Sequence, residues 1–320
     1  MEVYLTDISA FELWFTDQPV IRAAKPLRCV STFAQATVSS KEIPWNELNR
    51  IGLRKPIHLA VPDASRRRSS RNIICHVFRD PPPNSFVRLS PNVYVEAPIP
   101  TLIKMALSLP TGALLRLVYQ LLGAYQIKQG KIVERKPLAT LEELIAYTHH
   151  ATCIKGLEPV RNLLPYAIEK VASPEEARLA ALLFLDRERG GQNLPLAEAN
   201  VRIRLNNNAV ASKRYPDLLW RLWNLILEYD SDQCHSGAEK IGKDSARRAQ
   251  LQAAGYQVVT MTRLQLHDPA AFRDVIRTLE RFMGNTTPCD CGLPTRSFTH
   301  AELELRRELY RFDIERALGL

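Results

Sequence analysis

The chain has 320 residues, 46% of them hydrophobic and 24% charged, and its 43 Lys and Arg against 34 Asp and Glu give a formal net charge of +9. This composition is that of a basic globular protein and excludes a chain that is disordered throughout. The longest stretch free of charged and strongly polar residues, 105–115, is too short for a transmembrane helix, and we expect none. The first 12 residues carry acidic side chains, whereas a secretory signal begins with basic ones. The six cysteines do not have the spacing of a disulfide framework. We therefore expect a cytoplasmic protein with reduced thiols.

The length predicts two or three compact units. Periodicity divides the chain into N-terminal helices with a basic β unit at 1–97, a helical region at 98–172, an α/β domain at 173–283, and a loop with a terminal helix at 284–320. The expected fold class is α/β, as part of a mixed α+β chain.

In the N-terminal segment, apolar residues at helical spacing predict helices beginning at Asp7 and at Trp45. Short apolar runs separated by the turn-rich segments SRRRSSR and DPPPNS predict strands at 56–61, 72–78, 86–89 and 93–96. From 98 to about 171 the apolar spacing is helical in segments, which Gly123, Pro137, Gly156 and Pro159 punctuate.

From residue 173 the predicted order is that of an α/β domain. Ser173, Pro174 and Glu176 have the spacing of a capped helix N-terminus. The elements expected after this helix are a strand at 201–205, a hairpin at 217–230, a helix at 239–254, a strand at 256–261, and helices at 268–282 and 299–314.

Positive charge is concentrated in residues 51–90, which carry eight Lys or Arg and two Asp, so that +6 of the total of +9 lies there. Four of the basic residues, Arg66, Arg67, Arg68 and Arg71, fall in one loop of the predicted β unit. Two interpretations stay open for this loop: contact with nucleic-acid phosphates, and plain exposure to solvent.

Three carboxylates lie at the ends of the otherwise apolar hairpin: Asp217, Glu228 and Asp230. With a two-residue turn at Leu222 and Trp223, position 217 lies opposite 228, and the strand period of two puts Glu228 and Asp230 on one face. Carboxylates that close repel one another unless a cation or a proton lies between them, and hard oxygen ligands suit Mg²⁺ or Mn²⁺. The alternative is a set of strand-end acids in solvent.

The pattern Pro216-Asp217, ten residues, Glu228-Tyr229-Asp230 resembles the PD-(D/E)XK nuclease superfamily. The segments SPEEARLAALL and EKIGKDSARRAQLQAAGYQVVTMTRLQL flank the hairpin in the order seen in very-short-patch-repair-like endonucleases, so that 173–283 resembles their nuclease domain. The resemblance implies a restriction-endonuclease-like domain with a central mixed sheet flanked by helices. Residues 56–172 look like the DNA-binding regulator region of AbiE-type antitoxins.

For the catalytic site, the resemblance implies Mg²⁺ or Mn²⁺ held by Asp217 and Glu228, with Glu176 pointing in from the first helix. Asp230 takes the place of the superfamily's lysine, and His235 is the candidate base that activates or orients the attacking water. Glu176 has a second explanation as the capping-box residue.

For DNA, the resemblance implies a double-stranded partner whose phosphates contact Lys240, Lys243 and Arg247 on one face of the polar helix. Two departures, Ser231 for a glycine and Cys234-His235 for paired histidines, bear on cleavage. The expected function is therefore a metal-dependent DNA endonuclease, and the alternative is a non-catalytic DNA-binding regulator of a defence or toxin-antitoxin system. Metal binding by Cys289 and Cys291 stays open, as does the oligomeric state.

Overall fold

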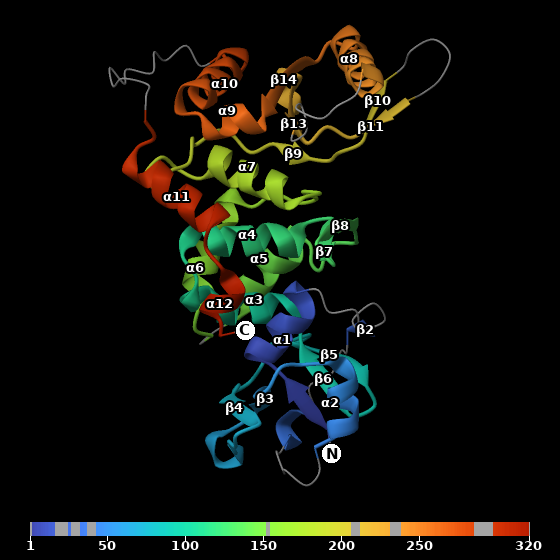
Figure 1. Ribbon diagram of the computed structural model, residues 1–320. Coiled ribbons are helices and arrows are strands. Elements are labelled where there is room, and N and C mark those ends of the chain that lie inside the picture. The colour runs from blue at the N-terminus through green and yellow to red at the C-terminus, as the bar shows by residue number, and fades with distance from the viewer. Residues whose placement is uncertain are drawn as a thin grey trace. The chain divides into compact units, whose positions relative to one another are not determined.

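The computed structural model of the chain describes residues 2–16, 25–26, 33–36, 43–151, 154–205, 212–230, 238–284 and 297–319. They form two compact units, one of Met1–Ala167 with Phe312–Leu320 and one of Ile168–Arg311. The expected mixed α and β class is confirmed, because sheets of mixed strand direction are packed against helices in both units (Figure 1). Within the described residues, no helix is long and apolar enough to cross a membrane.

The N-terminal unit is built on a six-stranded mixed sheet. Its strands, in spatial order, are β2 (Lys25–Pro26), β5 (Phe86–Ser90), β6 (Val93–Glu96), β1 (Val3–Leu5), β3 (Ile57–Val61) and β4 (Ile73–Val77). β1 runs parallel to β6 and antiparallel to β3, while β3 and β4 are parallel to each other. The arginine-rich loop is therefore the crossover between two neighbouring parallel strands, and not the turn of a hairpin.

Successive side chains of these strands point to opposite faces of the sheet, and both faces are apolar. Leu5 and Leu59 belong to a cluster that also contains Leu13 of α1 (Asp7–Phe15) and Leu48 of α2 (Trp45–Ile51). Tyr4 belongs to a second, aromatic cluster, with ring centroids 5.0 Å from Phe33 and 5.1 Å from Phe86. Both faces of the sheet are thus buried, as the apolar runs of the sequence require.

The helical region packs onto the sheet within the same unit. Its helices are α3 (Pro98–Met105), α4 (Thr111–Leu122), α5 (Leu141–His150), α6 (Leu157–Arg161) and the C-terminal α12 (Ile314–Ala317). α1 contacts both α3 and α4, and the sheet and these helices belong to the same unit, which the chain leaves after Ala167 and enters again at Phe312. The 3-10 helices of the described chain are η2 (Phe33–Gln35), η3 (Ala64–Arg66), η4 (Ala106–Ser108), η5 (Leu164–Tyr166) and η6 (Arg221–Trp223).

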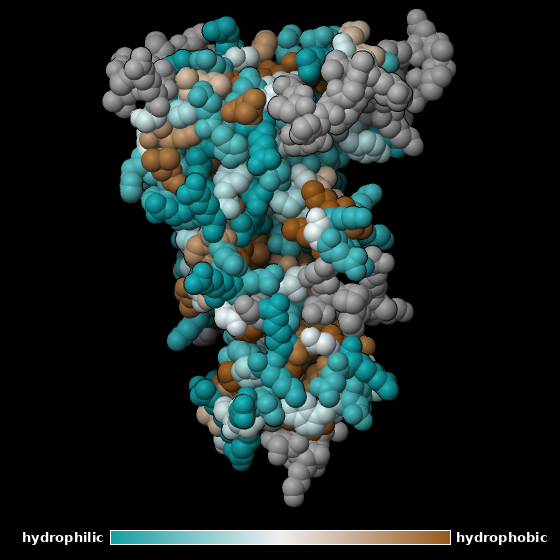
Figure 2. Space-filling model, in the orientation of Figure 1, coloured by the Kyte–Doolittle hydropathy of each residue, from teal (hydrophilic) through white to brown (hydrophobic). Residues whose placement is uncertain are grey.

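A β-hairpin interrupts the expected helical region. β7 (Tyr125–Lys128) and β8 (Lys131–Glu134) are joined by Gln129 and Gly130, whose φ angles of 50° and 70° are those of a tight hairpin turn. The predicted helical region was punctuated at Gly123 and Pro137 but contained no strand, whereas the structure has this hairpin between them. Its local sequence signal is the Gln129-Gly130 turn. Ile127 and Ile132 face each other across the strands and are 45% and 54% exposed, in the apolar area over this hairpin in Figure 2.

The C-terminal unit contains a four-stranded sheet of order β14-β13-β12-β9, which is antiparallel except for the parallel pair β13 and β14. Its elements are α7 (Pro174–Phe184), β9 (Glu198–Ala199), β10 (Ile203–Leu205), β11 (Ser212–Arg214), β12 (Leu218–Trp220), β13 (Leu225–Asp230), α8 (Ala238–Ala253), β14 (Gln257–Thr262), α9 (Arg263–His267), α10 (Pro269–Phe282) and α11 (His300–Tyr310). Most of the elements expected from 173 onward are confirmed. The helix expected at 299–314 ends at Tyr310, because Asp313 caps the separate helix α12.

α7 and α8 lie on opposite faces of this sheet (Figure 1). Phe184 of α7 meets Trp220 with ring centroids 6.4 Å apart. Leu251 of α8 packs against Leu219 and Ile226, whose side chains point to the other face. The two helices thus bury both faces of the β12–β13 hairpin, and the candidate site lies at the open end of that hairpin.

Candidate active site

The hairpin register brings Asp217 beside Glu228. β12 and β13 pair through Leu218 with Leu227 and Trp220 with Leu225, and Asp217 directly precedes the first of these pairs. The connection is a four-residue loop, Arg221–Asn224, and not the two-residue turn that was expected. Both turns are centred on the same point of the chain, so the expected pairing of 217 with 228 holds although the expected turn was wrong.

Backbone contacts hold the Asp217 carboxylate at the end of the hairpin. Its Oδ2 accepts a hydrogen bond of 2.7 Å from the backbone N–H of Tyr229. Glu228 and Asp230 follow Ile226 at the strand period of two, so both point to the face that α8 covers. Asp217 and Glu228 therefore form the acid pair of the site, with Asp230 farther along the same face.

Glu176 is held by the cap of α7. Its backbone N–H donates to the Ser173 hydroxyl at 3.1 Å, and its Oε2 accepts from the backbone N–H of Ala172 at 2.8 Å. Oε2 also accepts from Asn200 Nδ2 at 2.6 Å, while the Asn200 backbone N–H donates to the carbonyl of Pro216 at 3.0 Å. Asn200 therefore ties the cap of α7 to the segment that carries Asp217, a role that no local sequence pattern indicated.

The charges around Asp217 do not balance. Burial, followed by the neighbouring carboxylates of Glu176 and Glu228, raises the pKa of Asp217 to about 7, against the lowering effects of the Tyr229 N–H and of Arg247. Buried carboxylates that repel one another take up a proton or a cation, and oxygen donors suit hard divalent ions. The donor set at Asp217 and Glu228 thus fits Mg²⁺ or Mn²⁺.

Arg247 of α8 lies inside this cluster. One of its Nη atoms donates to Glu228 Oε1 at 2.9 Å and to the carbonyl of Tyr215 at 3.3 Å, while its Nε is buried without a hydrogen-bond partner. The expected phosphate contact therefore needs Arg247 to leave its present carboxylate partner.

The remaining predicted residues of this site fall outside what the structure describes. His235, Cys289 and Cys291 lie in undescribed segments, and Lys240 and Lys243 lie on α8 with undescribed side chains. Among the described residues, the one set of three His, Cys, Asp or Glu side chains with ligand atoms all within 4.8 Å of one another is in the N-terminal unit, and it was missed from the sequence. Within the described part of the C-terminal unit, a cation thus has a pair of acids and not a triad.

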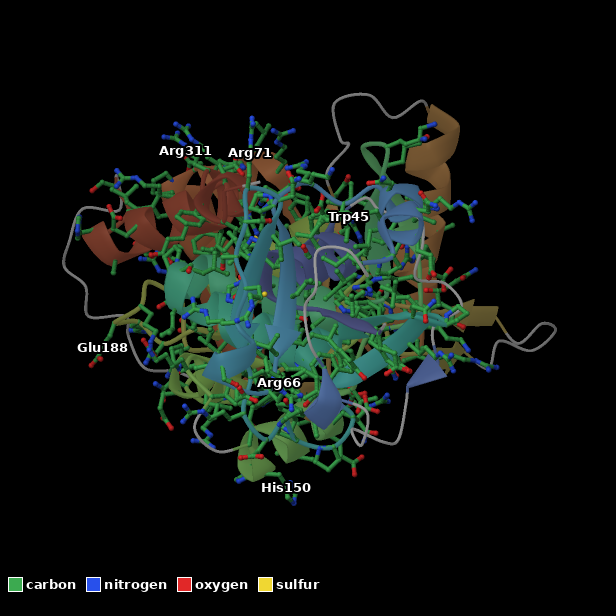
Figure 3. The ribbon with its side chains drawn as sticks, turned by 90° about the horizontal axis from the view of Figure 1, so that it is seen from below. Trp45, Arg66, Arg71, His150, Glu188 and Arg311 are labelled. Carbon is green, nitrogen blue, oxygen red and sulfur yellow. The ribbon has the colours of Figure 1, made fainter. Side chains whose placement is uncertain are left out.

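The arginine loop makes its own contacts. Arg66 donates to the Ala34 carbonyl at 2.7 Å and Arg67 to the Cys75 carbonyl at 3.0 Å, which are structural roles that neither interpretation of the loop anticipated. Arg68 and Arg71 are exposed. Figure 3 shows Arg66 and Arg71 well apart, so the four arginines do not form a single cluster.

Comparisons of the chain with protein-family models, with curated proteins and with solved structures gave no match. The function is therefore inferred from the residues of the site and their contacts.

Proposed function

We propose that the protein is a metal-dependent DNA endonuclease in which Asp217 and Glu228 bind Mg²⁺ or Mn²⁺. The observation that carries this proposal is the half-buried Asp217 carboxylate, which has Glu176 and Glu228 as neighbours and more negative charge around it than Arg247 balances. Two ionised acids side by side repel each other, and a bound cation relieves this repulsion, so such a site favours cation binding.

The arrangement of elements supports the same function. α7, the β12–β13 hairpin, α8 and the strand β14, which is parallel to β13, follow in the order that the resemblance to very-short-patch-repair-like nucleases implies. The acid pair lies where β12 begins and β13 ends, and Arg247 of α8 lies beside it.

Each residue of the site has a chemical task in this proposal. A bound divalent cation would neutralise charge on the scissile phosphate and lower the pKa of the attacking water. The Tyr229 N–H fixes Asp217, and Asn200 with the Ala172 N–H fixes Glu176 beside it. Arg247, released from Glu228 when the cation binds, offers its guanidinium to a phosphate oxygen.

The Arg247–Glu228 ion pair favours a second candidate function. At 2.9 Å, the guanidinium supplies positive charge at the place where a cation would supply it. Ser231 and Cys234-His235 stand where the resemblance expects a glycine and paired histidines. A chain that keeps this ion pair in the presence of metal would be the non-catalytic DNA-binding regulator.

Nicking of supercoiled plasmid in Mg²⁺, Mn²⁺ or EDTA distinguishes the two functions. We expect metal-dependent nicking by the wild type and by the control Asp274→Asn, whose side chain is 72% exposed on α10 and pairs with Arg277 on the same helix. Asp217→Asn should not nick. Binding of DNA without nicking in any metal would favour the regulator, and absence of both would overturn both functions.

A further inference from the structure

We infer that Asp7, His58 and His76 bind a divalent transition-metal ion, with Zn²⁺ as the reference ion, at a site in the N-terminal unit that does not depend on the Asp217 acids. One ligand atom from each of these three side chains lies within 4.8 Å of the other two.

Three separate elements bring these residues together. His58 is on β3 and His76 on the neighbouring parallel strand β4, where His58 pairs with Ile74 and His76 with Ala60. That register puts the two histidines on the same face of the sheet, two residues apart along the strand direction. Asp7 is the first residue of α1, and the strand before it, β1, pairs with β3.

The distances are close to those of metal ligands. His58 Nδ1 lies 3.0 Å from His76 Nε2 and 3.6 Å from Asp7 Oδ1, and Asp7 Oδ2 lies 3.7 Å from His76 Nδ1. Two ligand atoms about 2.0–2.1 Å from a tetrahedral zinc ion lie roughly 3.3 Å apart. The first and third distances end on different ring nitrogens of His76, of which one can bind a given ion, so the ligand set is one atom from each side chain, all within 4.8 Å of one another. Binding therefore requires these side chains to rotate toward a common ion.

Backbone and side-chain contacts pre-position the three ligands. The backbone N–H of His58 donates to Ser9 Oγ at 2.9 Å, which ties β3 to the first turn of α1. The backbone N–H of Asp7 donates to the buried Glu96 carboxylate at 3.3 Å, which also accepts from the Thr6 hydroxyl at 2.7 Å. Asp7 has a φ of 51°, in the left-handed region, and these contacts hold it there.

The donor set selects the class of ion. Two imidazoles with one carboxylate suit Zn²⁺ and neighbouring first-row ions, whereas Mg²⁺ and Ca²⁺ prefer oxygen ligands throughout. The side chains of Asp7, His58 and His76 are 24%, 12% and 31% exposed, so an ion there would be reached from solvent. Three protein ligands with access to water are typical of an open coordination site, and not of a closed structural one.

The surrounding charges permit a cation. Lys104 and Arg67 both place positive charge near His76. The Nζ of Lys104 is paired with Glu96 at 2.5 Å and hydrogen-bonded to Thr6 Oγ1 at 2.8 Å, and Arg67 donates to the Cys75 carbonyl. Glu96 is fully buried, so this pair compensates the Lys104 charge locally. The Asp7 carboxylate then remains to offset the charge of a bound ion. The competing explanation is a metal-free hydrogen-bonded group, in which one imidazole N–H donates to the other ring.

Calorimetric titration of the full-length, EDTA-treated and desalted protein with Zn²⁺ separates the two explanations. We expect the wild type to bind one more equivalent of Zn²⁺ than His58→Gln or His76→Gln does. If these variants still bind that equivalent, their affinity for it should be more than about 100-fold weaker. His150→Gln, which changes an exposed histidine at the end of α5, and Asp217→Asn should both keep it. Equal stoichiometry and affinity in His76→Gln and wild type would overturn the site.

X-ray absorption of the wild type loaded with one equivalent of Zn²⁺ gives a measurement that needs no variant to fold. We expect two imidazole ligands with oxygen ligands completing the shell. Sulfur ligands, which would place the ion at cysteines, or fewer than two imidazoles would contradict the proposal.

Discussion

Asp217 is the residue at which burial and charge conflict most directly. Its carboxylate accepts the Tyr229 N–H, yet burial and two neighbouring acids keep its pKa near neutrality. The folded state therefore binds a proton between about pH 4 and 7 that the unfolded state has released, and stability falls as the pH rises through that window. Of the groups that influence Asp217, Glu176 and Glu228 raise its pKa and Arg247 lowers it.

The substitution Asp217→Asn removes this conflict and keeps an oxygen that accepts the Tyr229 N–H. In EDTA, its unfolding free energy should match that of the wild type near pH 4. Above pH 4, the unfolding free energy of the variant should exceed that of the wild type by a difference that grows up to about pH 7. The difference should reach the order of 4 kcal/mol and stay constant above that pH. Urea denaturation from pH 4 to 8 measures the difference, with the exposed-site variant Asp274→Asn measured alongside as the control. A pH-independent difference for Asp217→Asn would contradict the assigned pKa.

Arg247 should be the counter-charge of the metal-free site. Replacing it by Gln removes the 2.9 Å ion pair with Glu228, so the melting temperature in EDTA should fall, by the equivalent of about 1–3 kcal/mol. Stabilisation by Mn²⁺ should be larger than in the wild type, because no guanidinium competes with the ion.

The matched control for this variant is Arg248→Gln. Arg248 lies next to Arg247 on α8, is exposed, and donates to the Thr260 hydroxyl at 3.0 Å. Its effect should stay within about 0.5 kcal/mol. If Arg247→Gln changes the melting temperature no more than this control does, in both EDTA and Mn²⁺, Arg247 is not part of the site.

At the scale of elements, one buried ion pair joins the N-terminal sheet to the helical region. Glu96, the last residue of β6, pairs with Lys104 of α3 at 2.5 Å and accepts hydrogen bonds from Thr6 and Asp7 at the start of α1. These contacts, with α1 packed on α3, explain why the sheet and the helices are one compact unit.

The substitution Glu96→Gln should cost about 3–5 kcal/mol of unfolding free energy, since it leaves the mostly buried Lys104 without its counter-charge. The double variant with Lys104→Met should recover part of this loss. Glu158→Gln is the surface control: its pair with Arg161 is exposed, and its effect should stay below about 1 kcal/mol. Equal effects of Glu96→Gln and Glu158→Gln in urea denaturation would show that the buried pair is not needed.

For the whole molecule, the charge of +9 predicts salt-dependent binding to DNA. The slope of log affinity against log salt concentration should fall by about 0.9 for each DNA phosphate that the protein no longer neutralises. Alanine at both Arg68 and Arg71 should therefore reduce the slope by about 1–2. Alanine at Arg66 and Arg67 should also lower stability, because their partners are backbone carbonyls. If the slope is unchanged after alanine substitution of Arg68 and Arg71, the loop is exposed to solvent and does not contact DNA.

What the sequence determined by itself is local. Ser173, Thr299 and Asp268 cap their helices through N–H groups three residues ahead, so the helix starts could be predicted from short patterns. The pairing of Asp217 with Glu228 could also be predicted, because strand alternation and the centre of the turn are both local properties. The β7–β8 hairpin had a local signal as well, in Gln129 and Gly130.

Only the tertiary structure decided which distant side chains meet. Asn200 reaches Glu176 because β9 pairs with β12, and His58 meets His76 because β3 and β4 are neighbours in the sheet. Asp7 joins them because β1 lies between β6 and β3. No residue pattern within one element predicts these neighbours, since strand order depends on how the whole unit buries its apolar faces. The local sequence therefore predicts the acid pair of the hairpin, while the Asp7, His58 and His76 cluster is a product of strand order.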